Sequence, residues 1–530
     1  MTAFTGVGPL VRFLLRRDRI YLPVWIVAIV AVVYASLSAV RRLYTTQEQI
    51  AAYEATVTAS PASVAMAGPP LALDQVGGIL VYETSLTALL GVALMAVFTV
   101  VRHTRREEDA GRVELLGSTV VSPHAVITAA VLVSAGASVL VGAGITAAFL
   151  AEQQPMTESL LYGASVAALG VVFTAVAAAA AQVMSHGRGA VGLSLGVLAV
   201  VFGIRAIGDV AENFLVWLSP MGWSQQVGAY GYNRWWPLAL SMGLTVVLLG
   251  ATVALESRRD LGSGIVPPRP GPASAGRGLH GVVGLAWRLQ RGALLGWVVG
   301  VFGMAVLLGS FSESIENLVE ENPAMAEVFA PTGTESLVDA YMAISLLLLG
   351  IGAAGYAVSS ALRLKAEEST GRLEPVLATG VSRERWLVGN LLVTGLTTTV
   401  LVASGGLGLG LSYAVTSRRP EEVWQMTWAS LVYLPAVLLV AAVAVLLFGA
   451  LPRATAAAWV VVGFAFVVGW LGELLEIPAW IKDLSPLSHV PAVPAEQVTT
   501  GPLTVTVLAL LALLLVGWFG FRRRDVGAST

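Results

Sequence analysis

The chain has 530 residues, of which 56% are hydrophobic and only 12% are charged, and its formal net charge is −2. Soluble domains carry about 25% charged residues, so this composition cannot supply a water-exposed surface for a chain of such length. It predicts an all-α integral membrane protein and excludes a secreted enzyme, a nucleic-acid-binding protein and a disordered scaffold. The absence of cysteine excludes disulfides and thiolate metal sites.

Twelve apolar stretches are long enough to cross a bilayer, which takes about 20 residues per helix. In chain order the predicted spans are 20–40, 82–101, 125–150, 160–184, 189–207, 236–255, 292–312, 340–362, 387–414, 426–450, 454–472 and 500–521. They form two groups of six, in a first half (1–256) and a second half (292–530). The intervening segment 257–291 is rich in Pro, Gly and Arg and reads as a linker.

The distribution of charge predicts the orientation of these spans. An even number of spans puts both termini on one side, and short cytoplasmic loops carry an excess of Lys and Arg. With the termini in the cytoplasm, the inner segments hold 24 of the 31 basic residues and 12 of the 33 acidic ones. Arg41 and Arg42 are a local exception. The first apolar run, 21 residues long, exceeds the 7–15 residues of a signal-peptide core, so we expect it to remain as a span.

The two halves share a charged motif after their second span. Arg105–Ser122 and Leu364–Ser382 align at an offset of 260 residues. The identical positions in the first copy are Glu107, Glu108, Gly111, Arg112, Glu114, Thr119, Val121 and Ser122, and those in the second are Glu367, Glu368, Gly371, Arg372, Glu374, Thr379, Val381 and Ser382. A Leu-Ser-Pro triplet also recurs, at 218–220 and 484–486. The chain is therefore predicted to be a parallel 6+6 duplication, with the two copies in the same orientation.

Each charged segment is predicted to form a short polar helix on the inner face. Glu108 and Arg112 stand in the favourable i,i+4 order, as do Glu368 and Arg372. Gly111 weakens the helix, which makes sense where the helix must break or where another group approaches closely. Ser122-Pro123 reads as an N-cap followed by proline at the first helical position of the third span, and Ser382 can cap the ninth span similarly. A merely solvated loop would not need the same pattern twice.

The pattern E-E-x-x-G-R-x-E, followed by a small-Thr-x-Val-Ser run, resembles the corresponding segment of ABC-2 type transporter permeases. The doubled twelve-span form resembles actinobacterial exporters of polyketide antibiotics, of the tetronasin-exporter type. The resemblance implies a type V exporter-like fold, a multi-pass location in the bacterial cell membrane and export of lipophilic or amphipathic antibiotics and drugs. It also implies that each segment is a coupling helix that docks on a separate ATP-binding subunit. The coupling residues are then Arg105, Glu107, Glu108, Gly111, Arg112, Glu114, Lys365, Glu367, Glu368, Gly371, Arg372 and Glu374.

Permeases of this family also have an amphipathic connecting helix before the first span. Residues 8–19 fit this role, and Leu285–Arg291 is a weaker second copy at the end of the linker. The alternative for both is a generic basic anchor at the lipid headgroups.

The chain has no means of hydrolysing ATP. A phosphate-binding loop requires G-x-x-x-x-G-K-[ST], and neither Lys365 nor Lys482 follows a glycine. We therefore expect a non-enzymatic permease that binds no cofactor, with ATP and Mg²⁺ held by an ATPase partner. Because the chain carries two coupling segments, we expect two copies of that partner. The alternative is a proton-driven carrier of the major facilitator kind, disfavoured because the predicted spans carry no charge at their centres. A membrane enzyme lacks the necessary cluster of His and acidic residues.

The transport pathway has few candidates. The resemblance places spans 1, 2 and 5 with spans 7, 8 and 11 at the seam between halves, where Trp25, Tyr82, Glu83, Arg205, Trp297 and Tyr341 are weak candidates. Anchoring in the interfacial aromatic belt competes with this role for each aromatic residue. Glu83 is a possible partner for Arg205 at the outer mouth, although snorkelling to the headgroups is the simpler expectation. Glycine-rich spans indicate close helix packing.

Overall fold

In the computed structural model of the chain, the elements are helical throughout the described residues, which are 5–58, 61–117, 120–260, 262–267, 273–274, 276–279, 281–312, 337–471 and 477–525. Within these ranges, twelve helices are long and apolar enough to cross a membrane. The predictions of an all-α chain and of twelve spans are thus confirmed by length and composition. Thr119 of the repeated motif lies outside the described residues.

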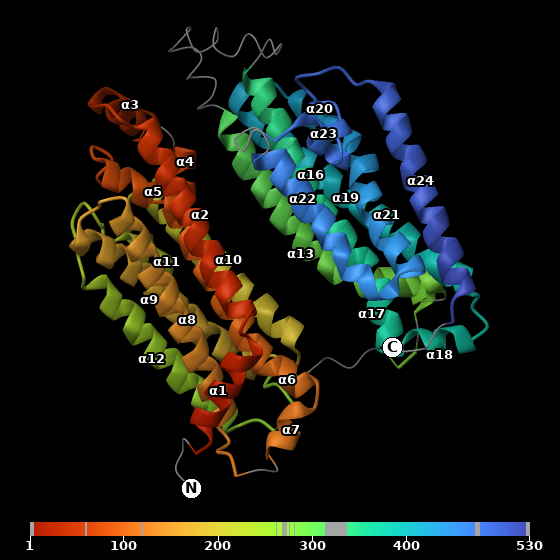
Figure 1. Ribbon diagram of the computed structural model, residues 1–530, viewed down its shortest axis with the longest axis horizontal. Helices are drawn as coiled ribbons and strands as arrows, with labels where there is room; N and C mark the ends of the chain where they lie inside the picture. The colour runs from red at the N-terminus through yellow and green to blue at the C-terminus, as the bar shows by residue number, and fades with distance from the viewer. Residues whose placement is uncertain are drawn as a thin grey trace. The chain divides into compact units, whose positions relative to one another are not determined.

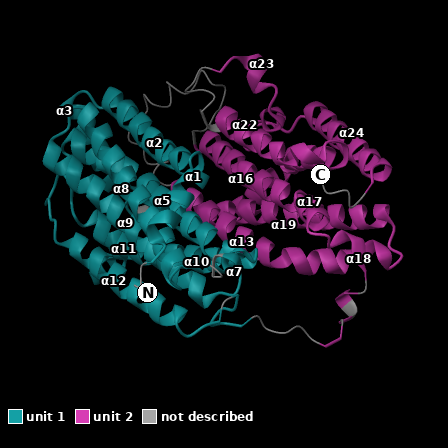
Figure 2. Cartoon of the chain, turned by 60° about the horizontal axis from the view of Figure 1, so that its bottom comes forward, with its two compact units in different colours: residues 1–270 teal, residues 271–530 magenta. Residues whose placement is uncertain are grey.

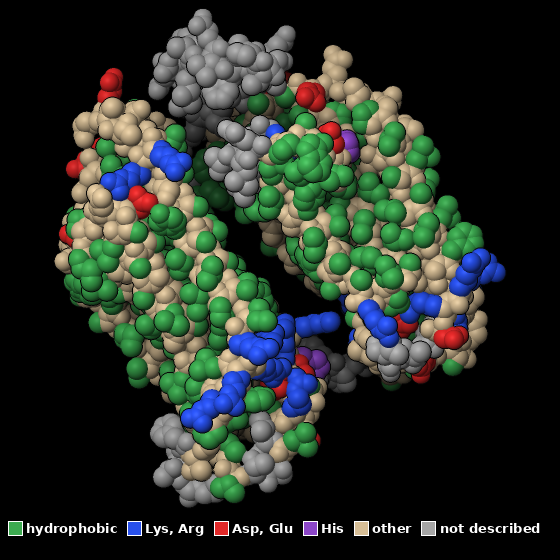
Figure 3. Space-filling view, viewed as in Figure 1, with side chains coloured by type: hydrophobic (Ala, Val, Ile, Leu, Met, Phe, Trp, Pro, Cys, Tyr) green, Lys and Arg blue, Asp and Glu red, His purple; other side chains and the backbone are tan. Residues whose placement is uncertain are grey.

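The chain divides into two compact units, Met1–Pro270 and Gly271–Thr530 (Figure 2). The boundary lies inside the segment predicted as a linker. Apolar side chains cover the middle of the helical surfaces, and Lys and Arg side chains gather at the end of unit 1 where α1 and α6 lie (Figures 1 and 3). Each unit therefore has an apolar belt with charged residues towards its ends, as a bilayer requires.

Unit 1 holds six of the candidate spans and several short helices. In chain order its elements are α1 (Val7–Arg17), α2 (Tyr21–Leu43), α3 (Gln47–Thr58), α4 (Pro61–Ala67), α5 (Val76–His103), α6 (Arg105–Asp109), α7 (Arg112–Gly117), α8 (Ala125–Ala151), α9 (Met156–Val183), α10 (Gly187–Val210), η1 (Phe214–Leu218), α11 (Pro220–Gln225) and α12 (Pro237–Glu256). Helix α9 packs against α5, α8 and α12. The fully buried Val92, Val141 and Phe173 belong to the apolar core around it.

Unit 2 holds the other six candidate spans, again with several short helices. Its elements are η2 (Arg277–Leu279), α13 (Val282–Ser310), α16 (Leu337–Ala361), α17 (Arg363–Ser369), α18 (Leu373–Ala378), α19 (Arg383–Ser417), α20 (Glu422–Val432), α21 (Leu434–Ala450), η4 (Pro452–Ala457), α22 (Ala458–Leu471), α23 (Ala479–Lys482), η5 (Pro486–His489) and α24 (Thr500–Arg523). Helix α19 packs along α13 and α20, and α21 packs along α24 and α16.

Several helix ends differ from those expected. Helix α5 begins at Val76 rather than at residue 82, because the exposed Glu83 does not interrupt it. Helix α8 begins at Ala125 with His124 at its N-cap, so the cap predicted at Ser122 is displaced. Ser382 caps α19 as predicted, since its side chain accepts a hydrogen bond from the Arg385 amide. The segment 285–291 forms part of the continuous helix α13, whereas α1 is a separate helix before α2.

Two glycines allow the backbones of α8 and α9 to touch. A β-carbon at Gly142 would lie 2.3 Å from the Gly163 carbonyl oxygen, and one at Gly163 would lie 2.4 Å from the Gly142 carbonyl oxygen. Gly136, on the same helix α8, has open space around it. Close packing thus explains Gly142 but not every glycine in the spans.

We expect Gly142→Ala to force α8 and α9 apart at a cost of about 1–3 kcal/mol, as overpacking does. The matched change Gly136→Ala meets no atom and should leave stability unchanged or slightly higher. Thermal unfolding midpoints of the purified variants in detergent test this. Equal midpoints for the two variants would show that the contact does not constrain the bundle.

Candidate functional site

The polar segment of unit 1 is a helix that ends, turns and starts again. Helix α5 ends at His103, the short helix α6 follows directly, and α7 begins after Gly111, whose φ of +69° lies in the left-handed region. This conformation favours glycine because a β-carbon would crowd the backbone. Among the described residues, no atom other than those of the chain neighbours lies within 4 Å of the β-carbon position. The structure therefore supports the helix break, one of the two reasons expected for this glycine.

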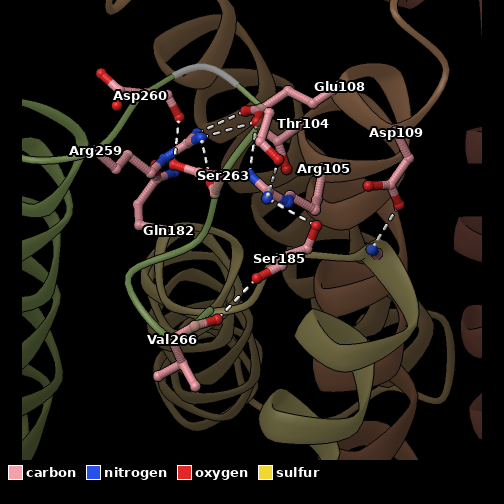
Figure 4. A network of polar contacts seen from close by, with 12 residues as sticks. Thr104, Arg105, Glu108, Asp109, Gln182, Ser185, Arg259, Asp260, Ser263 and Val266 are labelled. Carbon is pink, nitrogen blue, oxygen red and sulfur yellow. Dashed lines mark hydrogen bonds and ion pairs between the residues drawn. The ribbon is translucent and has the colours of Figure 1, made fainter. Parts of the chain in front are cut away.

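Glu108 is held between two arginines from different parts of unit 1 (Figure 4). Arg259, three residues after α12, donates from Nη2 to Glu108 Oε1 at 2.6 Å and from Nη1 to Oε2 at 2.8 Å. Arg105 Nη1 donates to the same Oε2 at 2.6 Å. The side chains of Arg105, Glu108 and Arg259 are 0%, 10% and 5% exposed. We call this cluster the unit 1 clamp, because it fastens α6 to the end of the last span of the unit.

Further bonds anchor α6 to α9 and α10. Arg105 Nη2 donates to the Ser185 carbonyl oxygen at 2.7 Å, and Arg259 Nε donates to Gln182 Oε1 at 2.6 Å. Asp109 accepts a hydrogen bond of 2.7 Å from the Gly187 amide at the first residue of α10. A carboxylate at that end of a helix is favoured by unpaired amides and by the helix dipole. Figure 4 shows Arg105 and Arg259 reaching Glu108 from two sides, with the Asp109 contact apart from them.

Glu107 faces the N-terminal helix α1 and the next helix α7. Arg17 lies 2.9 Å from Glu107 Oε1, and Arg112 donates from Nε to Oε2 at 2.6 Å. The hydrogen bonding to Glu107 raises the pKa of the Arg112 guanidinium above its ordinary value. The predicted i,i+4 pair between Glu108 and Arg112 is therefore wrong. The helix breaks at Gly111, so Arg112 meets Glu107 and leaves Glu108 to Arg105 and Arg259.

Unit 2 builds an equivalent clamp from different chain positions. Arg524, directly after α24, donates from Nη1 and Nη2 to the two oxygens of Glu368 at 2.7 and 2.8 Å. Lys365 Nζ lies 3.8 Å from Glu368 Oε2, where Arg105 stands in unit 1. The Arg524 guanidinium also lies over the Phe448 ring, 4.8 Å from its centroid. We call the group Lys365, Glu368 and Arg524 the unit 2 clamp.

The second polar segment also repeats the helix break and the neighbouring pair. Gly371 has a φ of +70°. Glu367 Oε1 lies 3.9 Å from Arg372 Nε, so here too the predicted i,i+4 pair, between Glu368 and Arg372, gives way to a pair with the preceding glutamate. Leu364 and Leu373 are buried in one apolar cluster with the aromatic side chains of α19, α21 and α24.

Arg259 and Arg524 were not among the residues expected from the sequence. Each directly follows another arginine behind the last apolar span of its half, at Arg258-Arg259 and Arg523-Arg524. These runs read as ordinary positive-inside loops. Comparing the two halves beyond the motif could have found them, although their offset is 265 residues rather than 260.

The outward surface of the polar segments consists of other residues. Arg112 and Arg372 have side chains that are 53% and 59% exposed. Glu114 and Glu374 are exposed as well, and Leu115 is 72% exposed. The predicted coupling residues therefore fall into two sets. Glu108 and Glu368 lie inward in the clamps, whereas Arg112, Glu114, Arg372 and Glu374 face outward.

A buried polar cluster joins α1 to α5 beside the unit 1 clamp. Asp18, after α1, is fully buried, with Oδ2 lying 2.6 Å from His103 Nε2 and Oδ1 lying 3.3 Å from Arg102 Nε. A buried carboxylate needs such partners because desolvation penalises an unpaired charge. The cluster fixes the turn between α1 and α2 to the end of α5.

The predicted pathway residues of unit 1 lie in different surroundings. Trp25 is half-buried near the start of α2, with its ring centroid 6.2 Å from that of Phe98. Tyr82 is buried and lines a cavity of about 30 Å³, which has room for one or two water molecules. Glu83 is exposed and accepts a hydrogen bond from the Tyr53 hydroxyl.

In unit 2, Trp297 is 36% exposed, with its ring centroid 5.9 Å from that of Tyr356. The half-buried Tyr341 donates to the Leu308 carbonyl oxygen at 2.8 Å.

Arg205 does not pair with Glu83 and does not snorkel. It is fully buried near the end of α10, with Nη1 3.4 Å from Asp209 Oδ2. Its other hydrogen bonds go to the carbonyl oxygens of Val64 and Met66 in α4. Carbonyl groups at the end of a helix can lack intrahelical partners, and the buried arginine donates to two of them, although the Val64 oxygen also accepts a hydrogen bond from the Gly68 amide. Both expectations for Arg205 are therefore wrong, and its contacts are those of a structural residue.

A scan of family models finds one that covers residues 279–522, described as the C-terminal domain of the multidrug efflux system permease Rv1217c. Over 535 aligned residues the chain is 38% identical to the multidrug efflux system permease protein Rv1217c of Mycobacterium tuberculosis (strain ATCC 25618 / H37Rv). That alignment spans 99% of this chain and 96% of the relative. The chain belongs to the Rv1217c family of efflux permeases. The candidate site in this permease consists of two clamped polar segments, one in each unit, at the ends of apolar bundles.

We expect Arg259→Ala to loosen α6 and α7, because it leaves a buried carboxylate with one cationic partner. Breaking a buried pair costs about 3–5 kcal/mol, so local opening should become roughly a hundredfold to several thousandfold more frequent. The rate of hydrogen–deuterium exchange of the amides of residues 105–117 measures this local opening. Arg258→Ala is the matched control, since its side chain is exposed. Equal protection in both variants would contradict the clamp. Arg524→Ala and Arg523→Ala repeat the comparison in unit 2.

We expect Gly111→Ala to strain the turn between α6 and α7 by about 1–2 kcal/mol, because alanine rarely adopts a positive φ. Gly111→Asn should cost less, since asparagine tolerates the left-handed region. The same exchange experiment reports both changes. If alanine and asparagine had the same effect, the backbone conformation would not be the reason for this glycine.

Proposed function

We propose that the chain is the membrane-spanning permease of an ATP-binding cassette exporter that moves lipophilic or amphipathic drugs out of the cell. The multidrug efflux relative supports the efflux role. The observation that carries the ATPase-driven reading is the twofold occurrence of a clamped polar segment with an exposed outer surface. A loop that served only to connect two spans would not need buried ion pairs in both units, because each such pair costs desolvation.

The orientation and duplication are part of this proposal. The excess of Lys and Arg supports a cytoplasmic location for α1, α6, α7, α17 and α18. The positive φ of Gly111 and Gly371 supports a duplicated origin. So do the buried serines of the two Leu-Ser-Pro triplets, Ser219 and Ser485, which are 0% and 1% exposed.

The proposed division of labour follows from exposure. The outward residues Arg112, Glu114, Arg372 and Glu374 dock on two copies of an ATPase subunit, which holds ATP and Mg²⁺. The clamps pass the displacement of each docked segment to the ends of α12 and α24. Buried arginine suits this task because its guanidinium makes two parallel hydrogen bonds to one carboxylate. Export to the outside then follows from relative motion of the helices, with no chemical step in this chain.

We expect Glu114→Arg together with Glu374→Arg to abolish co-purification of an ATP-binding cassette subunit from the native host. Both side chains are exposed, so expression and monodispersity should remain unchanged. Glu54→Arg, an exposed acidic position in α3, serves as the control. Quantitative mass spectrometry of the tagged permease gives the readout. Retention of the ATPase by the double variant, or its absence from the unmodified permease, would contradict the proposal.

A further inference from the structure

A cavity of about 310 Å³ lies beside the unit 1 clamp. Five parts of unit 1 form its wall: the α5–α6 junction and α6, α7, the start of α8 with the loop before it, the end of α9, and the end of α12 with the segment after it. Its volume is at the lower end of the range for small-molecule sites, which is about 300–1,000 Å³. The described wall therefore has room for a compact organic molecule rather than for water alone.

The wall has an apolar side and a polar side. Val113, Val126 and Ile127 supply apolar surface from α7 and from the first turn of α8. Gln182 and Thr104, which are 1% and 3% exposed, belong to the polar side together with the charged residues. A site of this kind suits an amphipathic ligand, because its apolar body and its polar end find different surroundings.

One carboxylate on the polar side has bonding capacity left over. Glu256, the last residue of α12, is 17% exposed, and its Oε2 lies 2.6 Å from His124 Nδ1. Within the described ranges its second oxygen, Oε1, has no hydrogen-bond partner. In contrast, both oxygens of Glu108 are bound by arginine.

The remaining charges bear on the class of ligand. Arg259 donates four of its five N–H groups to Gln182, to the two oxygens of Glu108 and to the Ser263 carbonyl oxygen, which leaves one N–H for an anion. Arg105 and Arg259 together neutralise Glu108, so among the described residues of the wall Glu256 is the carboxylate without an arginine partner. A divalent cation needs several oxygen ligands, and the wall offers one uncommitted carboxylate. A single organic ammonium group matches one carboxylate oxygen.

We propose that this cavity binds an amphipathic amine, with the ammonium group donating to Glu256 Oε1 and the apolar body lying against Val113, Val126 and Ile127. The cavity shares Glu108 and Arg259 with the unit 1 clamp, so a bound molecule contacts the groups that hold α6. The role of the cavity in transport, as a cytoplasmic site for a cationic substrate, rests on the proposed function. Binding of the amine itself requires only this chain.

Equilibrium dialysis of the full chain in lipid nanodiscs tests the site, with empty nanodiscs to subtract partitioning into lipid. The probes are 1-naphthylmethylamine, which carries the ammonium group, and 1-naphthylmethanol, which has the same ring without the charge. We expect Glu256→Gln to weaken binding of the amine by about tenfold or more, as loss of a charge-assisted hydrogen bond does, and to leave binding of the alcohol unchanged. Val126→Trp should remove binding of both.

Glu54→Gln is the matched control because it removes an exposed carboxylate elsewhere in unit 1. Monodispersity and the thermal midpoint show whether each variant is folded. If Glu256→Gln does not fold, Val126→Trp still tests the site. Amine binding that is insensitive to both variants, or no binding above empty nanodiscs, overturns the site. The assay contains no ATPase, so such a failure leaves the proposed function to its own test.

Discussion

A carboxylate can be buried at the end of a membrane bundle only if a cation comes with it, and this constraint shapes both polar segments of the permease. Glu108 and Glu368 meet it in the same way, through an arginine that follows the last span of the same unit. The pairing decides where α6 and α17 lie, and it leaves the outer residues of α7 and α18 exposed. A segment fastened in this manner is tied to the end of α12 or α24 by the ion pair.

The sequence predicted those features that depend on composition and local pattern. The twelve spans followed from apolar runs, and a helix break was one of the two reasons offered for Gly111 within a helical pattern.

The contacts of the site could not be predicted in the same way. Spacing along one helix suggested the wrong partner for Arg112, because the helix ends before it. The roles of Arg259 and Arg524 depend on tertiary packing that brings a distant loop beside α6 or α17. Arg205 shows the same limit, since its partners include carbonyl groups of α4, more than a hundred residues away in the chain. Helix propensity and charge counting contain no information about such partners.

The proposed function depends on one claim, namely that a separate ATPase supplies the energy for transport through the clamped segments. Drug uptake into inside-out proteoliposomes tests it most directly, with the permease reconstituted alone or with its co-purified ATPase, and with either ATP or an imposed proton gradient. The account predicts uptake only when the ATPase and ATP are both present. Uptake by the permease alone on a proton gradient would contradict it.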